Sequence, residues 1–159
     1  MGDSYNTYRP DRSKPPLRPP DWNTRNFCAI CEQARRDGLW ALPAHIDPAQ
    51  KHPCISWNEY QRRPPTEDEI AFWIARYPQR NGIYITGACL GRIIVDCDNE
   101  DADREVSRRG IHPTQTVRTR RGVHYHFRHP GFRVGNSASR IYPGVDIRGD
   151  GGVAVARSR

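Results

Sequence analysis

The segment 91–98, Gly-Arg-Ile-Ile-Val-Asp-Cys-Asp, constrains the fold more than any other stretch of the chain. Three β-favouring apolar residues predict a buried strand that runs directly into two carboxylates. Side chains alternate faces along a strand, so Asp96 and Asp98 are expected on the same side. Two carboxylates this close repel each other, and a hard divalent cation such as Mg²⁺ or Mn²⁺ would relieve that repulsion. A solvated strand end, or a cap for the next helix, would also explain the pair.

Composition favours one basic domain with a polyanionic partner. The chain has 159 residues, a formal charge of +7 and only two lysines, Lys14 and Lys51, so arginine supplies most of the positive charge. Arginine forks match phosphate oxygens, which predicts nucleic acid as the partner. An Arg-rich background composition is the alternative. No apolar run could cross a membrane and no signal peptide precedes the domain, so we expect no membrane partner and a cytoplasmic location.

The five cysteines do not form a recognisable disulfide or zinc pattern. Cys28 and Cys31 have metal-ligand spacing, and His45, His52 and Cys54 could complete a zinc site. A single Cys-x-x-Cys without further patterned ligands is weak evidence, so zinc is not expected.

The distribution of prolines and apolar residues predicts an arm followed by one folded unit. Residues 1–26 are rich in Pro and Arg and poor in aliphatic residues, and are expected to be disordered or loosely docked. Residues 27–159 are expected to form the folded domain. Its predicted class is α+β with a mixed or antiparallel sheet. Helices are predicted over 29–37, 66–77 and 101–109, and strands over 39–43, 82–87, 91–98, 115–120, 123–128, 145–147 and 153–156, the last two as a pair.

The strand 123–128 offers a second piece of chemistry. Alternation sends Val123, Tyr125 and Phe127 to an apolar face and leaves His124 on the opposite one, together with His126. A histidine there could bind phosphate or metal, or simply be solvated. The nearby Arg118, Arg120 and Arg121 favour phosphate, and Gly122 would let backbone amides approach an anion.

A third carboxylate follows the same design. Asp146 lies between Val145 and Ile147, which are expected to face the core and leave the aspartate on the opposite face. Three carboxylates and one histidine could then converge on one sheet surface. Two metal ions about 3.5–4 Å apart would there stabilise an in-line displacement.

The order of these motifs resembles the archaeo-eukaryotic primase superfamily. The pattern is hydrophobic-Asp-x-Asp, then Gly-x-His, then hydrophobic-Asp. It is more similar still to the bifunctional primase-polymerase domain of plasmid and phage replication proteins. Supporting matches are Lys51-His52-Pro53 with Trp57, the strand 82–87, Thr119-x-x-Gly122-x-His124-x-x-Phe127, and Asp146-Ile147-Arg148-Gly149. The resemblance covers about residues 34–158.

The resemblance implies a DNA primase/polymerase that transfers nucleotides under the direction of a template. It implies an RRM-like catalytic half and a smaller N-terminal α/β half. Asp96, Asp98 and Asp146 would bind two Mg²⁺ or Mn²⁺ ions. His124 would contact the triphosphate of an incoming NTP or dNTP, helped by Arg120, Arg121, Gly122, Arg148 and Lys51.

The implied partners are a single-stranded DNA template, a primer and a helicase domain or protein. The family usually shows Pro-Pro-Ser after its last strand. Here Ala156-Arg157-Ser158 stands near the chain end, which predicts a fragment or a minimal version.

Two other functions compete with this interpretation. His124-Tyr125-His126 resembles the His-hydrophobic-His metal motif of rolling-circle nucleases, for which Tyr142 would be the available nucleophile. Such a nuclease leaves Asp96 and Asp98 unexplained. A catalytically inactive nucleic-acid-binding module is the second alternative, and the three intact aspartates argue against it.

Overall fold

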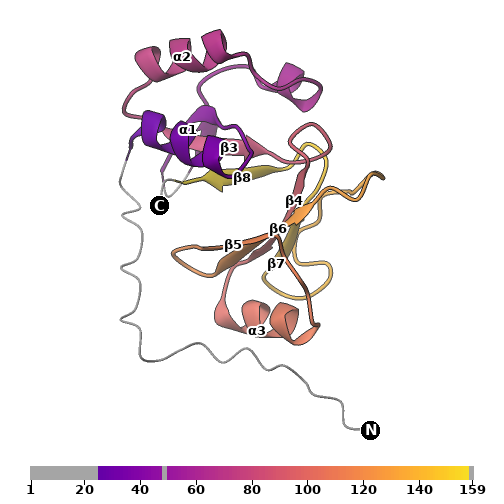
Figure 1. Cartoon of the computed structure of the whole chain (residues 1–159). Helices are drawn as coiled ribbons and strands as arrows, with labels where there is room; N and C mark the ends of the chain where they lie inside the picture. Colours follow the sequence, from indigo (N-terminus) through magenta and orange to yellow (C-terminus); the bar gives the residue numbers. More distant parts are fainter. Residues whose placement is uncertain (1–24, 48–49, 158–159) are drawn as a thin grey trace, which may run out of the picture.

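Two four-stranded antiparallel sheets form the body of the protein (Figure 1). The computed structural model describes residues 25–47 and 50–157. The predicted arm, residues 1–26, lies almost entirely outside this part of the chain. Figure 1 shows helices α1 and α2 at one end of the molecule and α3 at the other, with both sheets between them. This arrangement confirms the α+β class.

The first sheet combines strands from both ends of the described chain. Its order is β2-β1-β3-β8, so the last strand closes a sheet begun by the first two. Two helices and one 3₁₀ turn accompany it. The strands are β1 (Leu42–Ile46), β2 (Lys51–Pro53), β3 (Asn81–Ile85) and β8 (Val153–Ala156), and the helices are α1 (Phe27–Arg36), η1 (Asn58–Gln61) and α2 (Glu67–Arg76).

Helix α2 shows how local sequence determines an element here. Thr66 caps it in a reciprocal box with Glu69, which satisfies two amides at the helix start. One face of α2 packs on the main core, with Trp73 buried and Ile70 and Ile74 partly buried at helical spacing. Trp73 meets Tyr60 of η1 edge-on, with ring centroids 5.3 Å apart. The apolar face of α2 is therefore core, as its spacing predicts.

The second sheet carries the motifs. Its strands are β4 (Arg92–Cys97), β5 (Gln115–Arg118), β6 (Val123–Arg128) and β7 (Val145–Arg148), and helix α3 (Glu100–Arg108) follows β4. The order β5-β6-β4-β7 places β4 in the interior of the sheet. Helix α3 covers one face, where Val106 and Ala102 pack with Cys97 and Val145. An irregular segment, 129–144, stands where a βαββαβ unit would carry its second helix.

The predicted pairing of the last two strands is wrong. β7 pairs with β4, whereas β8 pairs with β3 in the other sheet. The four glycine- and aspartate-rich residues between them cross from one sheet to the other instead of closing a hairpin. Within the described residues no helix is long and apolar enough to span a membrane.

Candidate active site between the two sheets

Three of the predicted site residues are direct neighbours across the second sheet. Asp96 of β4 is in register with His124 of β6 on one side and with Asp146 of β7 on the other. Residues opposite each other in an antiparallel pair point to the same face. The structure thus brings together two motifs that lie 50 residues apart in sequence, at positions 96 and 146.

A guanidinium joins the two carboxylates. Arg148 Nη2 lies 2.9 Å from Asp146 Oδ2 and 3.4 Å from Asp96 Oδ2. Arg148 follows Asp146 by two residues on the same strand, so both side chains share one face. The two acids are therefore already oriented toward a single cation.

The remaining oxygens of these acids are also engaged. His124 Nε2 lies 3.2 Å from Asp96 Oδ1, and the Ser139 amide donates to Asp146 Oδ1 over 2.9 Å. Burial alone would raise the pKa of the Asp96 carboxyl. The His124 contact and the Arg148 guanidinium outweigh it and hold that pKa below its ordinary value. Asp96 is thus kept ionised.

The cluster is screened from solvent by its position between the sheets. Asp96 and Asp146 are each 9% exposed and His124 is 6% exposed. Arg157, just after β8 of the first sheet, is close enough for its charge to interact with Asp96, and burial lowers the pKa of its guanidinium to about 10. Charges in such a partly desolvated site interact more strongly than charges on an open surface.

Asp98 does not share this environment. Strand β4 ends at Cys97, and the Asp98 amide still donates to the Gly144 carbonyl in the register that β4 keeps with β7. The Asp98 side chain is 44% exposed, with Arg121 Nη2 3.9 Å from one carboxylate oxygen. The third predicted ligand therefore lies at the open end of the site, beside the β5–β6 hairpin.

Gly122 closes the β5–β6 hairpin over the end of β4. Its amide donates to Thr119 Oγ1 over 2.9 Å and so closes the hairpin. A Cβ at this position would lie 1.7 Å from the Cys97 carbonyl oxygen. Glycine is therefore needed here because the hairpin backbone passes directly over the end of β4. Arg120 and Arg121 are exposed on the same turn.

Three further candidates lie apart from the cluster. Lys51 is exposed on β2, at the edge of the first sheet away from β8. His126 shares the face of His124, but is only 2% exposed and meets the Tyr84 ring edge-on. Burial lowers the pKa of His126 to about 4, which makes it a neutral core residue. Tyr142, the candidate nuclease nucleophile, packs against the small core beside α3.

The cysteines and histidines form no preassembled metal centre in residues 25–47 and 50–157. No three His, Cys, Asp or Glu side chains there are arranged to hold an ion. Cys28 and Cys31 lie on α1, and burial raises the pKa of the Cys31 thiol to about 12.

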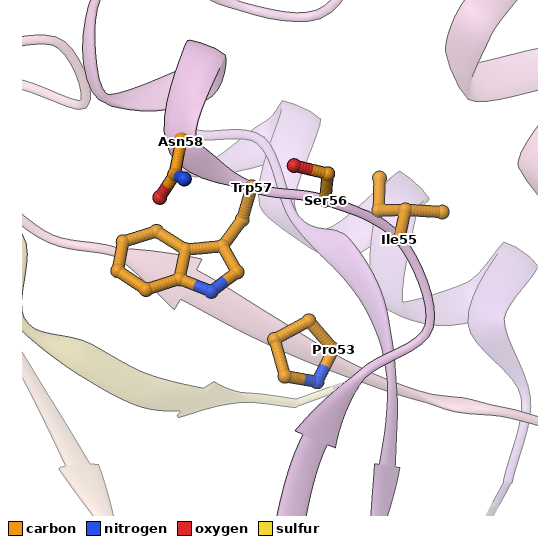
Figure 2. Close-up of a pocket in the computed structure, with 5 residues that line it drawn as sticks. All are labelled: Pro53, Ile55, Ser56, Trp57 and Asn58. Atoms are coloured by element: carbon orange, nitrogen blue, oxygen red, sulfur yellow. The ribbon is translucent and has the colours of Figure 1, made fainter.

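A hollow lies elsewhere, between β2 and η1. Figure 2 shows its lining, which comes from one continuous segment: Pro53, Ile55, Ser56, Trp57 and Asn58. None of these side chains ionises in the ordinary pH range. The hollow therefore lacks ionisable acid–base groups of its own.

Comparison with known families agrees with this placement. A sequence model described as "Bifunctional DNA primase/polymerase, N-terminal" matches residues 31–158, which include both sheets and the whole cluster. The chain belongs to this family of primase/polymerase domains. No curated protein matches it closely.

Two features of the site follow from residue spacing, and one does not. The face shared by Asp96, His124 and Asp146 follows from strand alternation. The bridging position of Arg148 could have been inferred from its spacing to Asp146. Arg157 gave no such signal, because it lies beyond a strand of the other sheet.

Proposed function

We propose that this chain is a template-directed nucleotidyltransferase, a DNA primase/polymerase that uses divalent metal ions held by aspartates. One observation carries the proposal: Asp96 and Asp146 lie in register on adjacent strands and share one guanidinium, with His124 against the far side of Asp96. Membership of the primase/polymerase family supports the same reaction. In it, a 3′-hydroxyl attacks the α-phosphate of a nucleotide and pyrophosphate leaves.

The donor set fits Mg²⁺ or Mn²⁺. Asp96 and Asp146 offer carboxylate oxygens, the ligands that these hard ions prefer, and they already converge on a cationic group. Asp98, at the open end of the site, is the third candidate ligand. When bound, two such ions would neutralise charge on the attacking and leaving oxygens.

The cationic side chains would position the nucleotide. His124 and Arg148 border the carboxylates, and Arg120 and Arg121 extend from the adjacent hairpin, so all four could donate to a triphosphate. Arg148 can exchange one anionic partner for another: it neutralises Asp96 and Asp146 in this structure, and phosphate oxygens would accept the same fork. Catalysis of this kind depends mainly on positioning and charge neutralisation.

Primer extension tests the proposal directly. The protein is incubated with a primed single-stranded DNA template, labelled nucleotides and Mn²⁺. We expect Asp96→Asn and Asp146→Asn to abolish extension while DNA binding, measured by fluorescence anisotropy, survives. An unprimed template and a parallel NTP series distinguish priming from extension and ribose from deoxyribose preference. Normal extension by the double variant would overturn the assignment.

A further inference from the structure

The basic charge of the chain is concentrated in one segment around the site. Residues 106–145 contain eight arginines and no aspartate or glutamate, while the whole chain carries a net +7. We call this stretch the acid-free segment. Its charge alone exceeds that of the entire protein, so the rest of the chain is close to neutral or slightly acidic. A polyanion would therefore be attracted to this part of the molecule first.

The acid-free segment flanks the carboxylates on both sides. It forms β5 and β6 on one side of β4, and then returns along the outer edge of β7, where Ser137 pairs with Ile147. Asp96 and Asp146 thus lie between two stretches that carry arginine. An extended polyanion that lies across the sheet would meet cationic side chains before and after the site.

Between β6 and the segment that pairs with β7, the chain forms a loop that side-chain hydrogen bonds fix in place. We call residues 129–136 the finger loop; Figure 1 shows the chain after β6 extending outward from the sheet. The Asp150 carboxylate contacts this loop at two points. One Asp150 oxygen lies 3.0 Å from His129 Nε2, and the other accepts from the Val134 amide over 2.8 Å. The Val134 bond, the largest influence, helps hold the pKa of Asp150 below its ordinary value, so the anchor persists at neutral pH.

The tip of the finger loop presents an aromatic ring and a cation to solvent. Phe132 is 69% exposed, the most exposed large apolar side chain in the described structure. Its neighbour Arg133 is also exposed, as are Arg128 and Arg140 at either side of the loop. None of these three arginines forms an ion pair with a described residue. A ring held out beside free guanidinium groups matches the way proteins bind unpaired nucleotides, by base stacking and phosphate contacts.

We propose that the finger loop is a binding surface for single-stranded DNA, with Phe132 stacked on a base and Arg133 and Arg140 on the flanking phosphates. The choice of DNA rests on the proposed function, whereas the binding itself can be measured without catalysis. The surface lies on the segment that returns to Asp146. It would therefore hold the strand next to the carboxylates.

Phe132 and Phe72 form a matched pair for the first test. Phe72 lies on α2 in the other half of the molecule and is 63% exposed. We measure the affinity of full-length variants for a fluorescein-labelled single-stranded DNA by anisotropy. Phe132→Ala should weaken binding about fivefold or more, the usual effect of losing one stacked base. Phe72→Ala should leave it unchanged. Equal effects of the two changes would overturn the proposal.

Two altered ligands test the stacking itself. With an abasic oligonucleotide of the same length, Phe132→Ala should have no effect, because there is no base to lose. A blunt duplex should likewise be insensitive to the change. If Phe132→Ala weakens abasic and ordinary DNA equally, or if only the matching RNA responds, the assignment of Phe132 to DNA bases is wrong.

The salt dependence tests the arginines. Arg133→Ala and Arg140→Ala should each reduce the slope of log K against log salt by about one, the effect of one lost phosphate contact. Arg36→Ala, at the exposed end of α1, is the control and should leave the slope unchanged. Slopes equal to wild type for both finger variants would overturn the proposal.

The experiments distinguish a wrong DNA-binding surface from a wrong catalytic assignment. If the wild type extends primers and Asp96→Asn does not, while the finger variants bind like wild type, only the surface is wrong. If the wild type binds DNA through Phe132 but no metal supports extension, the catalytic proposal alone is wrong.

Discussion

The two sheets have the same number of strands but bury different chemistry. In the first, the interior strand β3 contributes Ile83 and Ile85, each 1% exposed, to the main apolar core. In the second, the interior strand β4 presents Ile94 and then Asp96 on one face, and Asp96 is 9% exposed. Helix α3 supplies only a small core behind it. The first sheet therefore contributes most of the apolar core that stabilises the fold, and the second sheet carries the charged site. The apolar half provides the rigid support for the charged face.

The largest expected effect is on catalysis in the second sheet. Asp96→Asn keeps the shape of the side chain but removes its charge, so it should reduce Mn²⁺-dependent extension by about 10² or more, as loss of a charge-stabilising group usually does. Urea unfolding should show a loss of about 1–3 kcal/mol, because the charged contacts of Asp96 with His124 and Arg148 are lost as well. A variant that lost stability and kept its extension rate would break the division between the sheets.

The next effect is on stability in the first sheet. Ile83→Ala would leave a cavity in the main core, so the free energy of unfolding should fall by about 2–5 kcal/mol. Extension below the unfolding transition should remain close to wild type. Urea denaturation followed by tryptophan fluorescence measures the loss. A loss below about 1 kcal/mol would show that the core tolerates this cavity through repacking.

Arg148 connects the two properties. Arg148→Met removes the cation shared by Asp96 and Asp146, and should cost about 1–3 kcal/mol at pH 7, the range for charged hydrogen bonds. The lowered pKa of Asp96 stabilises the fold above the unfolded-state pKa of about 4, and this contribution is lost as pH falls. Wild type and variant should therefore converge in stability in acid. Thermal unfolding at several pH values checks this.

Metal provides the control for Arg148. If the two carboxylates bind Mn²⁺, adding the ion should raise the melting temperature of Arg148→Met more than that of wild type. In the variant the ion replaces the missing guanidinium between the two carboxylates. A double variant that also carries Asp96→Asn should lose the response. An equal rise in all three proteins would contradict the shared cation site.

The smallest expected effects come from replacing the residues that cap two helices. Thr66 caps α2 and Asn99 caps α3, where its side chain accepts from the Ala102 amide over 2.9 Å. Replacement of either by Ala should cost about 1 kcal/mol. Asn99 adjoins Asp98, so only Asn99→Ala should also slow extension. Parallel unfolding and extension assays distinguish the two, and equal loss of activity in both would contradict a local effect on Asp98.

Features that depend only on residues close in sequence could be predicted from residue spacing. The Thr66–Glu69 capping box, the apolar face of α2 and the shared face of His124 and His126 all follow from fixed spacings. The exposure of Asp98 depends on where β4 ends, one residue earlier at Cys97. A motif gives no sign of where its strand ends.

Pairing between distant strands could not be predicted in the same way. The strands 145–148 and 153–156 alternate as hairpin strands do, with a glycine-rich link of the usual length. Each nevertheless finds a better partner elsewhere, because β4 and β3 offer longer apolar strands to pair with. The finger loop was also missed, since its anchor, Asp150, lies beyond β7.

The close passage of Gly122 over the end of β4 also limits how this protein can change. The smallest possible side chain would press on the Cys97 carbonyl. It would force apart the backbones that hold the histidine and its carboxylate partner. In a mutational library this position should tolerate no residue other than glycine, for a steric reason.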